Sequence, residues 1–232
     1  MLIGSVVLVG TAVALGWVWF PLSLIVLPVL IWLFAFFRDP ERAVPEEQHT
    51  MVSPADGVVS DITEIDHDPL LDAPAIRVGI FLSVFNVHIN RAPCDGRVVD
   101  VIYKKGKFVN AMRHGEASSD NESNTLVLAE HEGDRRVAVV KQIVGLIARR
   151  IICTNQVGDH VKRGDRIGMI KFGSRTELYI PKWLDPKIEV AVGQKVRGAA
   201  DVIARLGNPI QVTRPEPIDQ EYEPIAQRRT PA

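Results

Sequence analysis

Cysteine and metal-ligand patterns are sparse in this sequence. Its 232 residues include two cysteines, Cys94 and Cys153, which lie far apart and form no CxxC pair. Neither a disulfide framework nor a zinc ribbon is therefore indicated, and a reducing, cytosolic environment is the simpler interpretation. The six histidines have no HxH or HxxxH spacing, so the sequence predicts no metal site.

Motifs of nucleotide and hydrolase chemistry are also missing. The sequence contains no GxGxxG and no GxxxxGK(S/T), which leaves dinucleotide or nucleoside triphosphate binding unsupported. It has no GxSxG, the usual nucleophile elbow of serine hydrolases. The 27 basic and 28 acidic side chains nearly cancel, so no nucleic-acid partner is predicted.

Charged residues and histidine are absent from residues 1–37, which predicts a hydrophobic membrane anchor. A single helix of this length would run about 55 Å, well beyond a hydrocarbon core of about 30 Å. We therefore expect two short helices that meet near Phe20 and Pro21, either spanning the bilayer or only inserting into it. A cleaved signal peptide fits less well, because no basic segment precedes the apolar run. Arg38 and Arg42 follow directly and favour a body on the cytoplasmic face of the inner membrane.

The body, residues 38–210, is expected to be mainly β, an α+β chain with few helices. Short runs rich in Val and Ile are separated by Gly, Pro, Asp and Asn, which is typical of strands. Residues 141–152 fit either a helix face or a buried strand, and Gly145 weakens the helix. The tail, 211–232, is rich in proline and is expected to be flexible. The predicted strands are Val58–Val59, Ala75–Phe81, Arg97–Tyr103, Thr125–Leu128, Val137–Val140, Ile167–Ile170 and Leu178–Ile180.

Two internal echoes refine the fold prediction. "PADGVV" from Pro54 recurs as "PCDGRVV" from Pro93, and "VGDHVKRG" from Val157 recurs as "VGQKVRG" from Val192. Both are turn-and-strand units, so Asp56 and Asp95 are first interpreted as turn residues. The second echo resembles the turns of lipoyl- and biotinyl-type folds. The body is therefore predicted to be a lipoyl/biotinyl-like β sandwich or barrel.

One stretch carries residues with chemical potential. "MIKFGSRTELYIP", residues 169–181, consists of two strand-like pieces interrupted at Gly173 and Ser174. A Gly-Ser dipeptide alone is typical of a loop. His88 and Asn90 lie two residues apart in another strand-like segment, so both should point to one face. That face is either a satisfied polar patch or one wall of a site.

Four motifs in order resemble those of the short bacterial phosphatidylserine decarboxylase proenzymes. They are "SPADG" from Ser53, "FNVHINRAPCDG" from Phe85, "QIVGLIARRI" from Gln142 and "KFGSRTELYIP" from Lys171. The resemblance covers nearly the whole chain, and four ordered motifs are far more specific than any one. Two positions depart from the family pattern: Asn86 stands where aspartate is frequent, and "NESN" from Asn121 lacks an arginine.

The resemblance implies that the chain makes its own prosthetic group. Cleavage between Gly173 and Ser174 would give a β chain ending at 173 and an α chain starting at 174, with Ser174 converted to a covalent pyruvoyl group. It also implies that His88 is the base that activates the Ser174 hydroxyl and that Asp56 orients His88. Asp95 keeps its interpretation as a turn residue. No external cofactor would be needed.

The implied reaction is decarboxylation of phosphatidylserine to phosphatidylethanolamine and CO2, in phospholipid biosynthesis. The substrate stays in the bilayer, which would give the amino-terminal segment its purpose. The α and β chains would form a heterodimer, compatible with a higher oligomer. Candidates for binding the phosphate by chemistry are Arg91, Arg149, Arg150 and Arg175.

Two alternatives are kept. One is a membrane-anchored, non-catalytic β-rich adaptor or carrier-like domain in which Lys171 is the residue of interest; it predicts an intact chain. The other is a pyruvoyl decarboxylase of a soluble amino acid, which predicts self-cleavage but gives the uncharged amino terminus no role.

Overall fold

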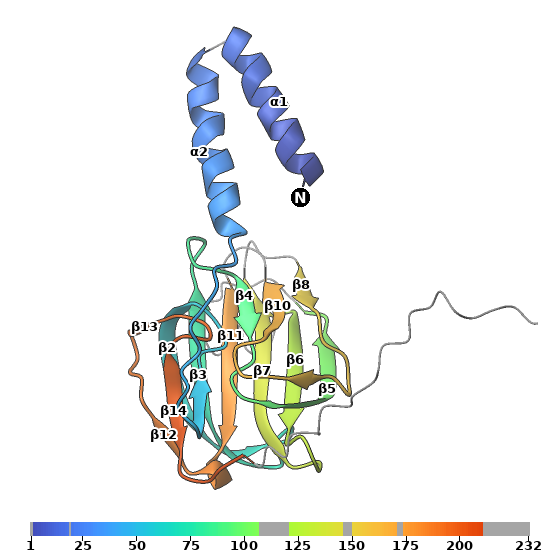
Figure 1. The fold of residues 1–232 in the computed structure, drawn as a ribbon, viewed down its shortest axis with the longest axis vertical. Helices are drawn as coiled ribbons and strands as arrows, with labels where there is room; N and C mark the ends of the chain where they lie inside the picture. The colour runs from blue at the N-terminus through green and yellow to red at the C-terminus, as the bar shows by residue number, and fades with distance from the viewer. Residues whose placement is uncertain (1, 19, 107–120, 146–149, 171–173, 211–232) are drawn as a thin grey trace, which may run out of the picture.

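The structure is a computed structural model that describes residues 2–18, 20–106, 121–145, 150–170 and 174–210. The described amino-terminal residues form two α-helices, α1 (Leu2–Val18) and α2 (Phe20–Phe36), which lie side by side and project from a β-rich body (Figure 1). The expected division into two short helices is confirmed, and Pro21 lies in the first turn of α2, where its missing N–H is tolerated.

Among the residues that the structure describes, no helix combines the length and the apolar character needed to cross a membrane.

The body is mainly β, as predicted. A large sheet of eight strands, in the order β13-β2-β3-β11-β7-β6-β5-β9, curls into a half-barrel, and two three-stranded sheets, β1-β14-β12 and β4-β10-β8, accompany it in the described residues (Figure 1). One short 3₁₀ helix, Lys182–Leu184, follows β11. The strands are β1 (Thr50–Val52), β2 (Gly57–Asp68), β3 (Ala73–Leu82), β4 (Ile89–Arg91), β5 (Gly96–Lys104), β6 (Ser123–Ala129), β7 (Arg136–Val144), β8 (Ile151–Cys153), β9 (His160–Val161), β10 (Arg166–Ile170), β11 (Ser174–Pro181), β12 (Pro186–Ile188), β13 (Lys195–Val196) and β14 (Val202–Leu206).

The structure decides between the two alternatives for residues 141–152 only in part, and it does not describe the predicted tail. Within residues 141–152, the described parts belong to β7 and β8, so the strand alternative holds there, and 146–149 lie outside the described residues. The predicted flexible tail, 211–232, also lies outside them.

The strand pairing shows an internal duplication. As far as the described residues go, β4 to β10 form one seven-stranded unit, and the second unit consists of β1 to β3 together with β11 to β14. Each unit contributes four neighbouring strands to the large sheet and one whole three-stranded sheet. The first unit is therefore inserted into the second, between β3 and β11, and the two join where β7 pairs with β11.

The two units agree in register and in their turns. β4 meets β10 with a register shift between Arg166 and Gly168, and β1 meets β14 with a shift at the corresponding place, between Met51 and Val52. Each unit also has an aspartate that accepts a backbone N–H from a second turn of the same unit. Asp56 Oδ1 accepts from Gly198 at 2.8 Å, and Asp95 Oδ1 accepts from Arg163 at 2.7 Å. The sequence echoes are therefore equivalent turns, and the turn interpretation of Asp95 is confirmed.

Strand β11 occupies the centre of the large sheet, and all of its residues are buried. It pairs with β3 on one side and with β7 on the other. Side chains alternate between its faces, so Leu178 and Ile180 join the main hydrophobic core on the face that also carries Ser174 and Thr176. The candidate nucleophile therefore lies on a strand that is fully buried and hydrogen-bonded to a neighbour on each side.

The opposite face of β11 carries a buried ionic cluster. Arg175 is fully buried; its Nε donates to Glu177 Oε1 at 2.8 Å, and its Nη2 donates to Asp61 Oδ1 at 2.6 Å. Tyr179 Oη donates to the other Glu177 oxygen at 2.7 Å. A Cβ on Gly79 would lie 2.1 Å from Arg175 Nη2, so glycine is needed there to leave room for the guanidinium.

Replacing Arg175 by methionine should strongly destabilise the fold, because Glu177 and Asp61 would lose their buried partner. The expected loss in free energy of unfolding is about 3–5 kcal/mol. The matched control is Arg205→Met, which removes exposed ion pairs with Glu47 and Glu189 and should cost far less, because solvent screens exposed charges. Denaturant unfolding of the full chain checks both values, and equal losses would contradict this account of the cluster.

Candidate active site

Ser174 is a buried hydroxyl for which the described residues supply no hydrogen-bond partner. It opens β11, pairs in register with Leu82 of β3 and Val144 of β7, and is completely shielded from solvent. Within the described part of the chain, its Oγ makes no hydrogen bond. A buried polar group left unsatisfied is costly, so such a group is a candidate for a functional role. Gly173, the other half of the predicted cleavage site, lies outside the described residues.

His88 is the second buried group with an unsatisfied atom. Its side chain is also fully shielded, and its Nδ1 lies 2.9 Å from the carbonyl oxygen of Asn86. A carbonyl can only accept a hydrogen bond, so Nδ1 carries the proton and Nε2 has a free lone pair. No hydrogen bond to Nε2 is present among the described residues. In the neutral imidazole, Nε2 is therefore a free acceptor, which is the state that a general base requires.

Burial keeps this imidazole neutral. Loss of hydration is the largest cause that lowers the pKa of His88, to about 4; the Asn86 hydrogen bond opposes it and the charge of Arg38 adds to it. Part of the cover comes from Phe36 at the end of α2, whose ring centroid lies 4.3 Å from that of His88. The amino-terminal helix thus packs directly on the candidate base.

A buried polar chain holds the segment of His88 against β11. Asn90 Nδ2 donates to Thr176 Oγ1 at 2.9 Å, and Gln142 Nε2 donates to Asn90 Oδ1 at 2.9 Å. Thr176 follows Ser174 by two residues and Asn90 follows His88 by two, so side-chain alternation directs Ser174 and His88 toward the same side. The backbone agrees, because the His88 carbonyl accepts from Ile170 N at 3.2 Å, at the end of the strand before Ser174.

Asp56 lies in a separate ion pair rather than against His88. Its Oδ2 accepts from Arg42 Nη2 at 2.7 Å while Oδ1 accepts the Gly198 amide. Burial is the largest influence on its carboxyl and raises the pKa, against the opposing effects of Gly198 and Arg42. Sequence reasoning missed Phe36 and Arg42 as contacts of this region, because it assigned Phe36 to the membrane anchor and used Arg42 only as a sign of orientation.

The four arginines proposed for phosphate binding do not share one environment. Arg91 donates to Asp39 and to the Gly164 carbonyl, and Arg175 is enclosed in the ionic cluster, so both have structural partners. Arg150 is exposed, and Arg149 lies outside the described residues. Asn86, one of the departures from the family pattern, accepts hydrogen bonds from the N–H and the hydroxyl of Ser83.

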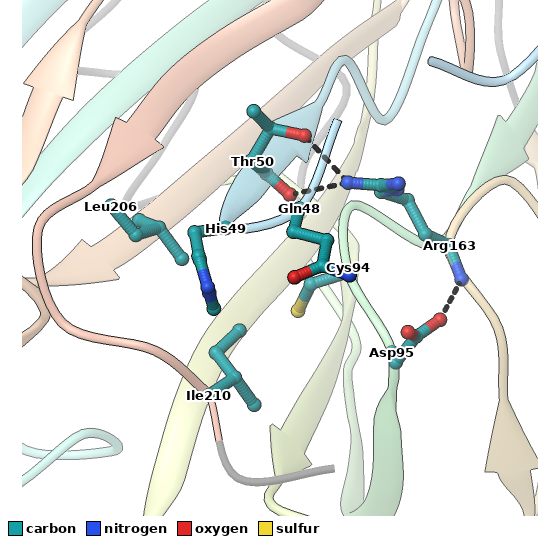
Figure 2. A pocket seen from close by; sticks show the side chains of 8 residues that line it. All are labelled: Gln48, His49, Thr50, Cys94, Asp95, Arg163, Leu206 and Ile210. Carbon is teal, nitrogen blue, oxygen red and sulfur yellow. Dashed lines mark hydrogen bonds between the residues drawn. The ribbon is translucent and has the colours of Figure 1, made fainter. Parts of the chain in front are cut away.

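The internal duplication gives the candidate site a counterpart elsewhere in the fold, a cavity of about 360 Å³ shown in Figure 2. His49 there corresponds to His88, because its carbonyl accepts from Leu206 as that of His88 accepts from Ile170. Asp95 corresponds to Asp56. Four residues after Leu206 stands Ile210, at the place where Ser174 follows Ile170.

This counterpart cavity has no hydroxyl nucleophile at the equivalent position. Its thiol, Cys94, is buried, and burial raises the pKa of that thiol well above its ordinary value, so it stays protonated. A protonated thiol is a poor nucleophile. The two halves therefore differ at this position, with the Ser174 hydroxyl in one and the apolar Ile210 in the other.

Comparison with known proteins gives a consistent family. The model of the family described as phosphatidylserine decarboxylase matches residues 29–204. A phosphatidylserine decarboxylase proenzyme of Rhodopirellula baltica is 47% identical over 205 residues, which cover 88% of this chain and 84% of the relative. Proenzymes of the same name from Ralstonia nicotianae and Carboxydothermus hydrogenoformans are 44% and 43% identical, covering 86% and 81% of this chain and 87% and 85% of the relatives.

The ordered motifs, the matching family model and the extent of these identities lead to one conclusion: this chain belongs to the phosphatidylserine decarboxylase family.

Proposed function

We propose that the chain is a self-processing carboxy-lyase that converts phosphatidylserine to phosphatidylethanolamine and CO2. Membership of the family carries the reaction class. The observation that supports the site is that two groups with acid-base and nucleophilic chemistry, the His88 Nε2 and the Ser174 hydroxyl, are buried and unsatisfied within the described residues. Both belong to segments that the Asn90–Thr176 hydrogen bond holds together.

Self-processing would begin at Ser174. His88 Nε2 takes the hydroxyl proton, Oγ attacks the carbonyl carbon of Gly173, and the peptide C–N bond breaks to leave an ester and a free amine. Loss of the Ser174 α-proton and of the Gly173 carboxylate then gives dehydroalanine. Water converts dehydroalanine to a pyruvoyl group and ammonia, which balances the nitrogen. General-base help of this kind is worth about 100- to 10,000-fold.

The residues around Ser174 fit such a group. A pyruvoyl carbonyl at this position would supply an electron acceptor for the electron pair released as CO2 departs. Asn90 and Thr176 hold the strand on which it would sit. His88 would deliver the proton that replaces CO2 on the substrate carbon, from Nε2. Asp56 is proposed as the carboxylate that orients His88, exchanging its contact with Arg42 for one with the imidazole.

The two chains produced by cleavage would remain associated. Strand β11, which begins the α chain, is hydrogen-bonded on both sides to strands of the β chain. The heterodimer would therefore be held by the centre of the large sheet, as well as by its core.

Residues 1–37 are proposed as the membrane anchor of a catalytic body formed by 38–210, on the cytoplasmic face of the inner membrane. Both helices leave large apolar side chains exposed, among them Val6, Val13, Trp17 and Ile25. Exposed apolar surface on this scale is characteristic of membrane or protein interaction. A lipid substrate that stays in the bilayer makes the membrane the better match.

The decisive assay is release of CO2 from carboxyl-labelled phosphatidylserine in vesicles. Wild-type protein should release CO2 and form phosphatidylethanolamine, whereas Ser174→Ala should release none because it cannot form the carbonyl. Thr176→Ser, which keeps a hydroxyl for Asn90, is the control and should stay active. Release from free serine but not from the lipid would favour the soluble-substrate alternative instead.

The self-cleavage rate should be insensitive to pH down to about 5, because His88 with its pKa near 4 stays neutral there. Below that pKa the base is protonated and the rate should fall. Phe36→Ala removes part of the cover, so the pKa should rise toward 6.5 and the fall should begin at a higher pH. Phe36→Leu keeps an apolar cover and should behave as wild type. Loss of intact chain after cell-free synthesis measures the rate, and identical profiles for all three would refute the role of Phe36.

A further inference from the structure

We propose that Lys195 binds the phosphodiester of the substrate headgroup, in a cavity beside Asp56 that opens near the base of α2. This inference rests on the proposed function and answers which cation holds the phosphate. It differs from the arginines that the sequence suggested, two of which have structural partners.

The cavity adjoins the candidate site. Its volume is about 570 Å³, and its lining includes Asp56, Ser83, Phe85 and Lys195. Ser83 directly follows Leu82, which pairs in register with Ser174. Asn86 also lines the cavity, and its carbonyl lies 2.9 Å from His88 Nδ1, so the cavity borders the segments of both the nucleophile's strand partner and the candidate base.

The base of α2 lies at the same place. Arg38, two residues beyond α2, donates from Nη2 to the Phe85 carbonyl at 2.8 Å. The Phe85 side chain is 72% exposed, which is unusual for a large apolar residue of the body. An exposed phenylalanine beside the proposed membrane helix suits contact with acyl chains, so a lipid would enter with its headgroup toward Lys195.

Lys195 is the cation of this cavity that remains available. Arg197 also lines it, but its Nη2 donates to Asp201 at 2.9 Å. The Asp56 carboxylate already accepts from Arg42. Lys195 is exposed, and no carboxylate contacts its ammonium group within the described residues. A lysine is a point charge that binds phosphate without the fixed planar geometry of arginine.

The duplicated unit indicates that the fold itself does not require this lysine. Lys195 pairs with Val58 between β13 and β2, and the equivalent pair between β9 and β5 is His160 with Arg97. The strand pairing is therefore maintained with a different side chain at that position. A lysine occurs in the half that also has Ser174, which is the half where an anionic headgroup would need it.

Three variants test the inference in the processed protein. Lys195→Ala removes the charge, Lys195→Arg restores it, and Lys162→Ala is the control, because Lys162 is exposed on the equivalent turn of the other unit. Self-cleavage should match wild type in all three. For short-chain phosphatidylserine, Lys195→Ala should raise KM by about 10- to 100-fold with little change in kcat, as expected for a lost charge-assisted hydrogen bond. Lys195→Arg should recover most of the affinity.

A binding measurement makes the result independent of catalysis. Glycerophosphoethanolamine carries the phosphodiester without acyl chains, and its Kd should rise by a similar factor in Lys195→Ala but not in Lys162→Ala. Ethanolamine, which has no phosphate, should bind both variants as it binds wild type. Inorganic phosphate that competes as strongly as glycerophosphoethanolamine would overturn the assignment to the headgroup.

The failures are distinguishable. Unchanged headgroup binding and unchanged KM in Lys195→Ala would overturn the role of Lys195, even with wild-type protein fully active. Absence of cleavage and of CO2 release in wild-type protein would instead contradict the proposed function.

Discussion

The antiparallel pairing of β11 with β7 is the contact on which the rest of the structure depends. It joins the two duplicated units, with Ser174 opposite Val144 at one end and Tyr179 opposite Val139 at the other. Because β11 is also paired with β3, its backbone is held from both sides. A serine at the start of such a strand has a fixed position, and a chain cut before it would stay in the sheet.

The two faces of β11 differ in whether their polar side chains have hydrogen-bond partners. On one face, the Arg175 guanidinium is paired with the carboxylates of Glu177 and Asp61. On the face of Ser174, the hydroxyl and the His88 Nε2 are both left unsatisfied in the described residues. Unsatisfied buried groups cost free energy, so the retention of both groups is most simply explained by chemistry.

The amino-terminal helices are linked to this site by contact as well as by sequence. Phe36 covers His88, Arg38 contacts the loop of Phe85, and Arg42 pairs with Asp56, all within a few residues of the end of α2. A segment that would meet the lipid thus also sets the environment of the candidate base. Catalysis and membrane attachment would then depend on the same short stretch of chain.

Much of this could be predicted from sequence, and the rest required three dimensions. Alternating Val and Ile predicted a mainly β body, and the echoes at Asp56 and Asp95 predicted equivalent turns. The insertion of one unit into the other was not visible in the sequence, because only short turns repeat there. The duplication becomes clear only from the order and the register of the strands. The burial of Arg175 was missed since arginine is usually exposed and its partner Asp61 is distant in the chain. The contact of Arg42 with Asp56 was missed because Arg42 had been considered only as a sign of membrane orientation.

The central claim, that Ser174 is both nucleophile and future prosthetic group, is tested most directly by the intact mass of purified protein. Wild type should give two chains, residues 1–173 and 174–232, and the smaller should resist amino-terminal sequencing because a pyruvoyl group has replaced its amine. A single intact chain from well-folded wild-type protein, or a smaller chain with a free amino-terminal serine, would contradict the account.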